Sequence, residues 1–149
     1  MHFLLLQLHK LIFKYFSSSA VNSFDRRRKY IHTFLGVLPQ ESRLLDVGAG
    51  TQQYRKYASY LNYVSQDFSE YDGLGDGGLN QSVDWDVSKT DIVSDILEIP
   101  VEDGSFDSVL CTDVLEYVPR AYDACNELRR IVKDGGKILI TVPTQCDAH

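Results

Sequence analysis

The residues best suited to chemistry are four aspartates, each at or just after the end of a short apolar segment: Asp46, Asp67, Asp95 and Asp113. The carboxyl ends of parallel strands meet at one edge of a sheet, where open α/β folds bind their ligands. Each carboxylate taken alone could equally cap a helix or face solvent in a loop. Their recurrence at successive predicted strand ends indicates one shared ligand site.

The segment LLDVGAGTQQY predicts a strand that ends in Asp46, a tight turn at Gly48 and Gly50, and a helix from about Thr51. Dinucleotide-binding enzymes use a G-x-G-x-x-G turn at this place to hold a pyrophosphate. Gln53 occupies the third glycine position here, and a carboxylate at Asp46 would repel phosphate. The turn therefore favours a ligand that carries an ammonium or sulfonium group over a nicotinamide dinucleotide.

The next two aspartates are spaced for a nucleoside. Asp67 ends the second predicted strand, 21 positions after Asp46, where a carboxylate accepts hydrogen bonds from both ribose hydroxyls. Asp95 ends the third predicted strand and is followed by Ile96, which pairs an acceptor for an adenine amino group with an apolar contact for the ring. NAD-dependent enzymes share the ribose feature, so these residues indicate an adenine nucleoside and no more.

Short apolar segments alternate with helical ones from Arg43 onward, which is typical of an α/β fold with a mainly parallel sheet and flanking helices. A helix is predicted from Arg120 to Lys133, with a stop at Asp134–Gly135–Gly136. Residues 70–89 are rich in Gly, Asp and Ser and predict a long surface loop. The predicted strands are Arg43–Val47, Leu61–Gln66, Asp91–Val93, Phe106–Cys111 and Lys137–Val142.

Residues 1–40 form a separate N-terminal part, before a core at 41–149. Residues 1–16 have the period of an amphipathic helix but are too short and too polar for a spanning helix, which needs about 20 apolar residues. This helix either packs on its own domain, which we favour, or lies in a membrane interface. A second helix is expected from a cap at Ser23 to about Val37, with a solvated face at Arg26–Lys29.

Charge and cysteine content restrict the class of partner. The net charge is −6, and residues 1–30 hold six basic residues against Asp25, which leaves the rest of the chain at −11. An acidic body repels a phosphate backbone, so we expect no nucleic-acid partner. Three cysteines without C-x-x-C spacing favour a reducing, cytoplasmic setting, and the scattered histidines predict no metal site.

Five motifs together resemble the class I S-adenosylmethionine-dependent methyltransferases, specifically the type 11 methyltransferase-domain branch: LLDVGAG, YVSQDF, DIVSDILEIP, FDSVLCTDVLEYV and ELRRIVKDGGKILITVP. The resemblance covers about residues 41–143 and implies a Rossmann-like fold with S-adenosylmethionine as cofactor. It implies that Asp46, Gly48 and Gly50 border the methionine part, Asp67 holds the ribose, Asp95 and Ile96 recognise the adenine, and Thr112 and Asp113 line the reactive side. Ala49 and Phe68 are expected to bind the cofactor beside these residues.

The chain departs from the family pattern at two positions. Gln52 stands where relatives often have another glycine, and Tyr117 stands where many have histidine. Tyrosine at that position removes a candidate general base, so we assign no catalytic residue. Methyl transfer from a sulfonium needs donor and acceptor held in line, and positioning alone can supply much of the acceleration.

The family fold has seven strands, of which this sequence predicts five, so we expect a chain that stops before the fold is complete. The apolar strand at 137–142 then has an unpaired edge that invites pairing with another strand. We expect a methyltransferase acting on a small or lipid-linked acceptor. The alternative is a non-catalytic remnant of the fold that keeps at most cofactor binding.

Overall fold

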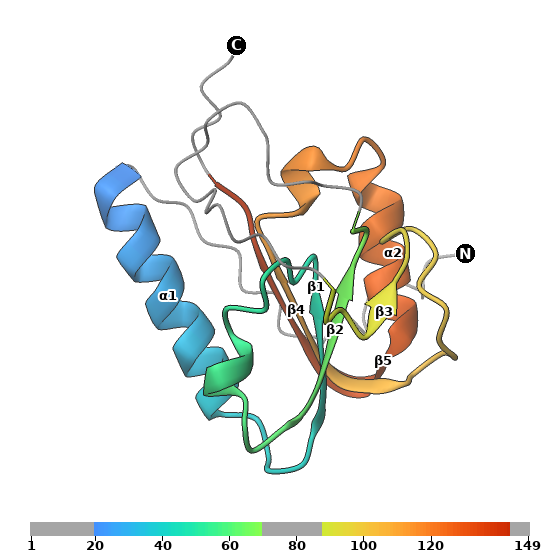
Figure 1. The fold of residues 1–149 in the computed structure, drawn as a ribbon, viewed down its shortest axis with the longest axis horizontal. Coiled ribbons are helices and arrows are strands. Elements are labelled where there is room, and N and C mark those ends of the chain that lie inside the picture. The colour runs from blue at the N-terminus through green and yellow to red at the C-terminus, as the bar shows by residue number, and fades with distance from the viewer. Residues whose placement is uncertain (1–19, 70–87, 144–149) are drawn as a thin grey trace, which may run out of the picture.

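The computed structural model describes residues 20–69 and 88–143, with side chains from residue 26 onward (Figure 1). Its centre is one sheet of five parallel strands, as the sequence predicts. The Rossmann-like α/β prediction is thereby confirmed. The strands are β1 (Arg43–Val47), β2 (Asn62–Asp67), β3 (Ile92–Val93), β4 (Phe106–Thr112) and β5 (Val132–Thr141).

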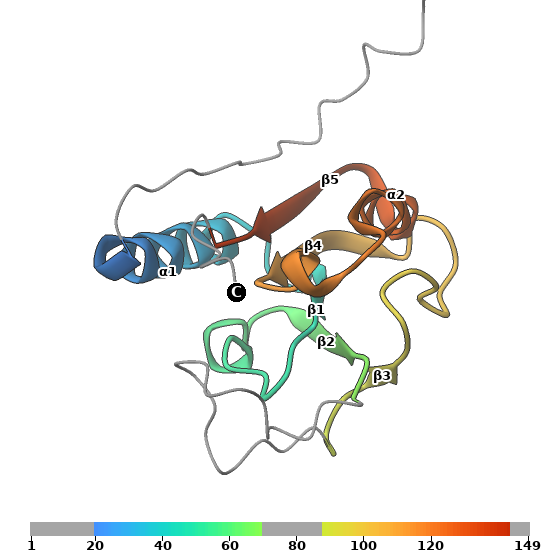
Figure 2. The ribbon, with the colours of Figure 1, turned by 90° about the horizontal axis from the view of Figure 1, so that it is seen from above.

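Helix α1 (Ala20–Gly36) covers one face of the sheet and helix α2 (Ala121–Ile131) covers the other, as the view from above shows (Figure 2). Two short 3-10 helices, η1 (Arg55–Tyr57) and η2 (Leu115–Tyr117), follow β1 and β4. Side chains of a strand alternate between the two faces. Leu44 of β1 therefore packs with α1, whereas Leu45 packs with α2.

The strand order is β3-β2-β1-β4-β5. The chain builds outward from β1 through β2 to β3, then crosses to the other side of β1 and continues with β4 and β5. The order therefore reverses between β1 and β4, and open parallel sheets bind ligands outside the carboxyl ends of the strands at such a point. Residues that follow β1 and β4 are placed to meet a ligand.

The helix predicted from about Thr51 is not present. Residues 51–54 form turns, and only the three-residue η1 follows. Gln52 has a left-handed backbone (φ 58°), which interrupts a right-handed helix. The segment still packs on the face that α1 covers, because Tyr54 and Ala58 share a buried cluster with Phe34 and Leu35 of α1.

The transition from α2 to β5 also differs from the prediction. The helix ends at Ile131, and β5 begins at once rather than at Lys137. Phe106 pairs with Val132 and Ser108 with Lys137, so β5 advances five residues while β4 advances two. The extra residues of β5 form a bulge in which Gly135 has a φ of 76°.

Helix α1 begins at Ala20, three residues before the predicted cap at Ser23. Ser23 therefore lies inside the helix and does not cap its start, and a serine costs less than about 1 kcal/mol there. Its end at Gly36 agrees with the prediction within one residue. The predicted helix over residues 1–16 and most of the predicted loop at 70–89 lie outside the described residues. Within the described part of the chain, no helix has the length and apolar content to cross a membrane.

Candidate functional site

The turn after β1 carries the two glycines that the sequence singles out. Gly48 and Gly50 have φ values of +63° and +48°, a region that side chains with a Cβ rarely adopt. A Cβ on Gly48 would lie 2.2 Å from Cγ2 of Val114, the residue that leads from β4 to η2. The amide of Ala49 donates a hydrogen bond to the carbonyl of Gln66 (3.0 Å). Glycine at position 48 thus lets the turn after β1 approach the segment after β4.

Asp46 lies within β1 rather than at its end, because it pairs with Leu110 of β4 and Ser65 of β2. Its side chain is 1% exposed and accepts a hydrogen bond from the hydroxyl of Tyr63. Burial raises the pKa of the Asp46 carboxyl group to about 7, and the Tyr63 hydrogen bond opposes that rise. When it is ionised, Asp46 can act on a bound cation through its charge, from beneath the turn.

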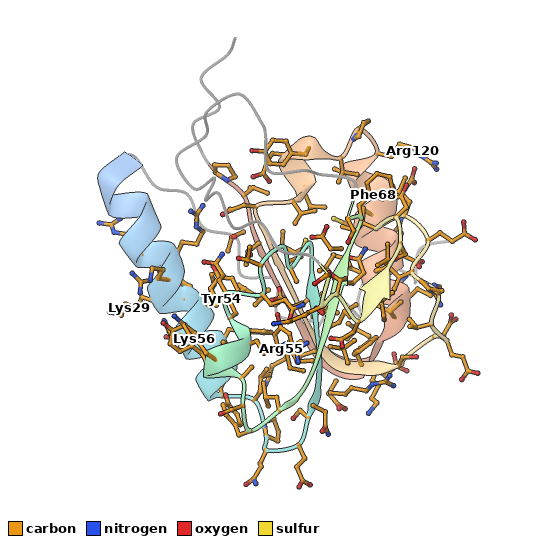
Figure 3. The ribbon with its side chains drawn as sticks, viewed as in Figure 1. Lys29, Tyr54, Arg55, Lys56, Phe68 and Arg120 are labelled. Atoms are coloured by element: carbon orange, nitrogen blue, oxygen red, sulfur yellow. The ribbon has the colours of Figure 1, made fainter. Side chains whose placement is uncertain are left out.

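Asp67 ends β2, as predicted, and faces the glycine turn. One of its carboxylate oxygens accepts the amide of Gly50 (2.9 Å) and the other accepts the amide of Ser69 (2.8 Å). A carboxylate offers about four acceptor positions, so two remain for hydroxyl donors. The next residue, Phe68, is 53% exposed and lies near the carboxyl ends of the strands (Figure 3).

Asp95 lies two residues beyond β3, which ends at Val93, and does not end the strand itself. Its carboxylate accepts the amide of Leu97 (2.9 Å) and is exposed. Ile96 is 7% exposed and belongs to the core beneath α2. Gln66 ties this segment to β2 by donating to the carbonyl of Ser94 (2.6 Å). The structure thus brings Asp95 to the correct edge of the sheet and turns Ile96 toward the core.

Thr112 ends β4, and Asp113 follows it with a left-handed backbone (φ 56°). The amide of Asp113 donates to the carbonyl of Thr141 (3.0 Å). Nη1 of Arg27 lies 2.8 Å from Oδ1 of Asp113. Burial raises the pKa of Asp113, whereas Arg27 opposes this shift. The solvated face predicted for Arg26–Lys29 is therefore wrong at Arg27, whose side chain is 17% exposed and reaches the sheet edge.

Glu116 of η2 adds a further carboxyl group beside Asp113. Its Oε2 is buried and has no hydrogen-bond partner among the described residues. Burial is the main cause that raises its pKa, and the charge of Asp113 adds to it. Tyr117, at the position where many relatives have histidine, is 81% exposed.

Three residues of the site were missed by sequence reasoning: Arg27, Tyr54 and Tyr63. Tyr63 has a signal in the sequence, because Tyr63, Ser65 and Asp67 alternate along β2 and place three polar side chains on the face of Asp46. Tyr54 and Arg27 have none, since α1 brings Arg27 to Asp113 across 86 residues of chain. Figure 3 shows Tyr54 between α1 and the sheet.

Comparison with known proteins identifies the family. A family model described as "Methyltransferase domain" matches residues 45–140. The chain belongs to the methyltransferase domain family. The demethylmenaquinone methyltransferase of Renibacterium salmoninarum is 33% identical over 117 residues, which cover 77% of this chain and 46% of that protein. The sarcosine/dimethylglycine N-methyltransferase of Halorhodospira halochloris is 28% identical over 74% of this chain and 40% of that protein.

A solved structure shows the same fold. The putative methyltransferase of Bacillus halodurans matches with a TM-score of 0.59 and 19% identity over 80% of this chain and 52% of that one. This methyltransferase domain therefore spans less than half the length of the two curated relatives and about half of this structural neighbour. The resemblance inferred from the five sequence motifs is confirmed, and with it the family's cofactor, S-adenosylmethionine.

The described residues of the methyltransferase domain fit this cofactor in two respects. A buried carboxyl group at Asp46 and a second at Asp67 favour a ligand with cationic and hydroxyl groups over a pyrophosphate. The left-handed turn at Gly48 and Gly50 exposes no Cβ to a ligand that rests on it. The individual contacts of the ten residues remain predictions.

Proposed function

We propose that this chain binds S-adenosylmethionine at the carboxyl edge of its sheet and takes part in methyl transfer to a small or lipid-linked acceptor. The observation that carries the proposal is the Asp67 carboxylate at the end of β2, joined to the amide of Gly50 in the glycine turn. A ligand that lies over this turn would contact Asp67 and lie above the buried Asp46.

In this proposal, Asp67 accepts the ribose hydroxyls and Asp95 accepts the adenine amino group. Asp46 supplies negative charge beneath the amino-acid end, while Thr112 and Asp113 border the side from which an acceptor approaches. The bound cofactor supplies a methyl group on a sulfonium, which is a good leaving group. The domain's own contribution is to hold donor and acceptor in line and to exclude water.

The acceptor follows from none of these residues. The two curated relatives carry names with different acceptors, demethylmenaquinone in one and sarcosine or dimethylglycine in the other. Fold and family therefore leave the acceptor open, as expected for functions that reside in sites rather than in folds. The alternative proposal is a non-catalytic remnant of the fold. It binds the cofactor at most and transfers no methyl group.

Calorimetric titration of S-adenosylhomocysteine tests the cofactor half. We expect saturable binding by the wild-type chain and a large loss of affinity in Asp67→Asn, because the amide substitute carries no charge and presents a donor to the ribose. Asp123→Asn is the matched control, since Asp123 pairs with Arg120 on α2 (2.7 Å) and takes no part in the site. Absence of binding by a folded wild-type chain would remove the proposal.

We also propose that β5 accepts a further strand at the sheet edge, through residues 137–142. Support comes from the position of β5, which has β4 on one side and is the last strand of the order. Light scattering across a concentration series tests this: a constant monomer mass would count against pairing between copies of the chain. Replacing Val142, which is 41% exposed, with lysine should weaken any pairing, because charge at a sheet edge opposes it.

A cytoplasmic location completes the proposal. Packing of residues 1–16 on their own domain is favoured, and contact of this segment with a membrane surface is the alternative. Its support lies in the sequence alone, in the amphipathic period and the basic residues of this segment. Co-sedimentation with anionic liposomes, with and without residues 1–16, tests the membrane contact. Equal sedimentation of the two forms would exclude it.

A further inference from the structure

Helix α1 brings a cation to the carboxyl edge of the sheet. Nη1 of Arg27 lies 2.8 Å from Oδ1 of Asp113, and the side chain of Arg27 is 17% exposed. Lys29, two residues further along the same helix, is exposed and lies on a different side of it (Figure 3). One arginine of the basic run at 26–29 is thus directed into the site.

The surroundings of Arg27 are acidic. Its positive charge opposes the burial-driven rise in pKa of both Asp113 and Glu116, so all three groups lie within electrostatic reach of one another. Burial and the charge of Asp113 raise the pKa of Tyr54, and Arg27 opposes this rise as well. Asp113 precedes Val114, which lies against Gly48, so Arg27 lies next to the glycine turn, where the methionine part of the cofactor is expected.

Arg55, which follows β1 in the 3-10 helix η1, is differently engaged. Its Nη2 lies 2.7 Å from Oδ2 of Asp91, and its Nε donates to the side chain of Gln52 (2.7 Å). Its guanidinium also stacks on the ring of Tyr63 at 4.7 Å. These contacts hold Arg55 beside β2 and β3, away from Asp113 on the β4 side.

The amino-acid end of the cofactor carries both an ammonium and a carboxylate. Aspartates at this edge attract the ammonium but repel the carboxylate, so an entirely acidic site would bind one group at the expense of the other. Recognition of both groups requires a cation next to the acids. A guanidinium meets this need well, because its planar donors match the two oxygens of a carboxylate.

We propose that Arg27 is a positioning residue that recognises the carboxylate of the cofactor's amino-acid end. The inference rests on the proposed function, since it concerns the same site. Asp113 holds the guanidinium in place beforehand, which lowers the conformational entropy lost on binding. The ligand carboxylate then shares Arg27 with Asp113 or replaces it. In this way α1 belongs to the cofactor site and is more than a cover for the sheet.

The test compares two ligands that differ at the amino-acid end. S-adenosylhomocysteine has that end, whereas 5′-methylthioadenosine keeps the adenosine and lacks it. We expect Arg27→Gln to weaken binding of S-adenosylhomocysteine by roughly tenfold or more, in line with the loss of a charge-assisted hydrogen bond. Binding of 5′-methylthioadenosine should stay unchanged. Lys29→Gln, with the same charge change on the same helix, should alter neither affinity.

Arg27→Lys keeps the charge and loses the planar donors, so it should weaken S-adenosylhomocysteine binding less than Arg27→Gln. This variant also provides the answer should Arg27→Gln prove unable to fold. If the ion pair only fastens α1 to the sheet, Arg27→Gln lowers the melting temperature and weakens the binding of both ligands together. The ratio of the two affinities then stays at the wild-type value. This result overturns the inference and leaves the cofactor site intact. Failure of the wild-type chain to bind either ligand overturns the inference and the proposed function together.

Discussion

The hydroxyl of Tyr63 on β2 donates a hydrogen bond to the carboxyl group of Asp46 on β1, inside the face of the sheet that α1 covers. Asp46 is 1% exposed, and burial raises its pKa to about 7. Burial and the neighbouring Asp46 likewise raise the pKa of Tyr63, so its proton remains on the hydroxyl. A residue whose charge the proposed cofactor needs is thus only about half ionised at pH 7.

Tyr63→Phe should therefore weaken cofactor binding at neutral pH without touching the ligand. The hydrogen bond from Tyr63 lowers the pKa of Asp46, so its loss raises that pKa further and reduces the charged fraction. Unfolding free energy should also fall, by about 1–3 kcal/mol, because a buried acceptor loses its donor. Titration of S-adenosylhomocysteine and urea unfolding measure the two effects. Tyr122→Phe is the control, because the Tyr122 side chain of α2 is exposed. It should change neither the affinity nor the unfolding free energy.

The pH dependence of stability gives a second prediction through Asp46. Its pKa rises from 3.8 to about 7 on folding, so between these values the folded chain holds a proton that the unfolded chain has lost. Stability then falls as pH rises from about 4 to about 7, by at most about 1.4 kcal/mol per pH unit, and the effect levels off above. The Asp46→Asn variant should lack this contribution. Its unfolding free energy should therefore rise relative to that of the wild type as the pH increases from about 4 to about 7.

Urea unfolding of both proteins at intervals across that window measures the difference. Parallel pH profiles for the wild type and Asp46→Asn would show that Asp46 does not titrate there. Asp123→Asn, which replaces a carboxylate that is 45% exposed on α2, should retain the wild-type profile.

The strands and the two glycines of the turn could be predicted from sequence because their causes are local. The run RLLDV has apolar residues on each of its two faces, and it forms β1 over the predicted residues. Gly48 is required by its backbone angle and by Val114, and the angle is typical of a tight strand-to-helix turn. Asp67 follows directly, since a residue at the end of β2 must lie at the sheet edge.

The remaining features depend on packing between distant segments. Arg27 looks like part of a solvated basic run, and only the position of α1 on the sheet brings it to Asp113. The helix expected after Thr51 is replaced by turns, and Gln52 there has a left-handed backbone that interrupts a right-handed helix. An isoleucine at position 96 suits an adenine contact and a core position equally well, so its type does not decide between them. The structure places Ile96 in the core.

Gly48→Ala should destabilise the fold and abolish cofactor binding. A left-handed backbone costs a residue with a Cβ about 1–2 kcal/mol, and the added methyl group would lie 2.2 Å from Val114. Gly48→Ala combined with Val114→Ala should recover part of the stability, because the contact is relieved while the backbone cost remains. Thermal unfolding measures both variants. Gly36→Ala is the control, since nothing lies within 4 Å of the position its Cβ would take.

Arg130 of α2 supports the segment that carries Asp95 and Ile96. Its guanidinium donates to the carbonyls of Ile99 (3.0 Å) and Val101 (2.8 Å) and to the carboxylate of Glu127 (2.7 Å). Glu127 in turn accepts the amide of Ile99 (2.8 Å). These bonds fasten residues 99–101 to α2, so we infer that Arg130 fixes the adenine side of the site from behind.

Arg130→Met should lower the unfolding free energy by roughly 2–4 kcal/mol, because it removes charge-assisted bonds and leaves the carboxylate of Glu127 without its cation. Adding Glu127→Met should restore part of that loss, since the unpaired carboxylate is then gone. Arg129→Met, at an exposed position of the same helix, is the control. A loosened segment at Asp95 should weaken S-adenosylhomocysteine and 5′-methylthioadenosine equally, unlike Arg27→Gln, which separates the two ligands. If Arg130→Met weakened the binding of the two ligands unequally, the adenine contact would not lie at the Asp95 segment.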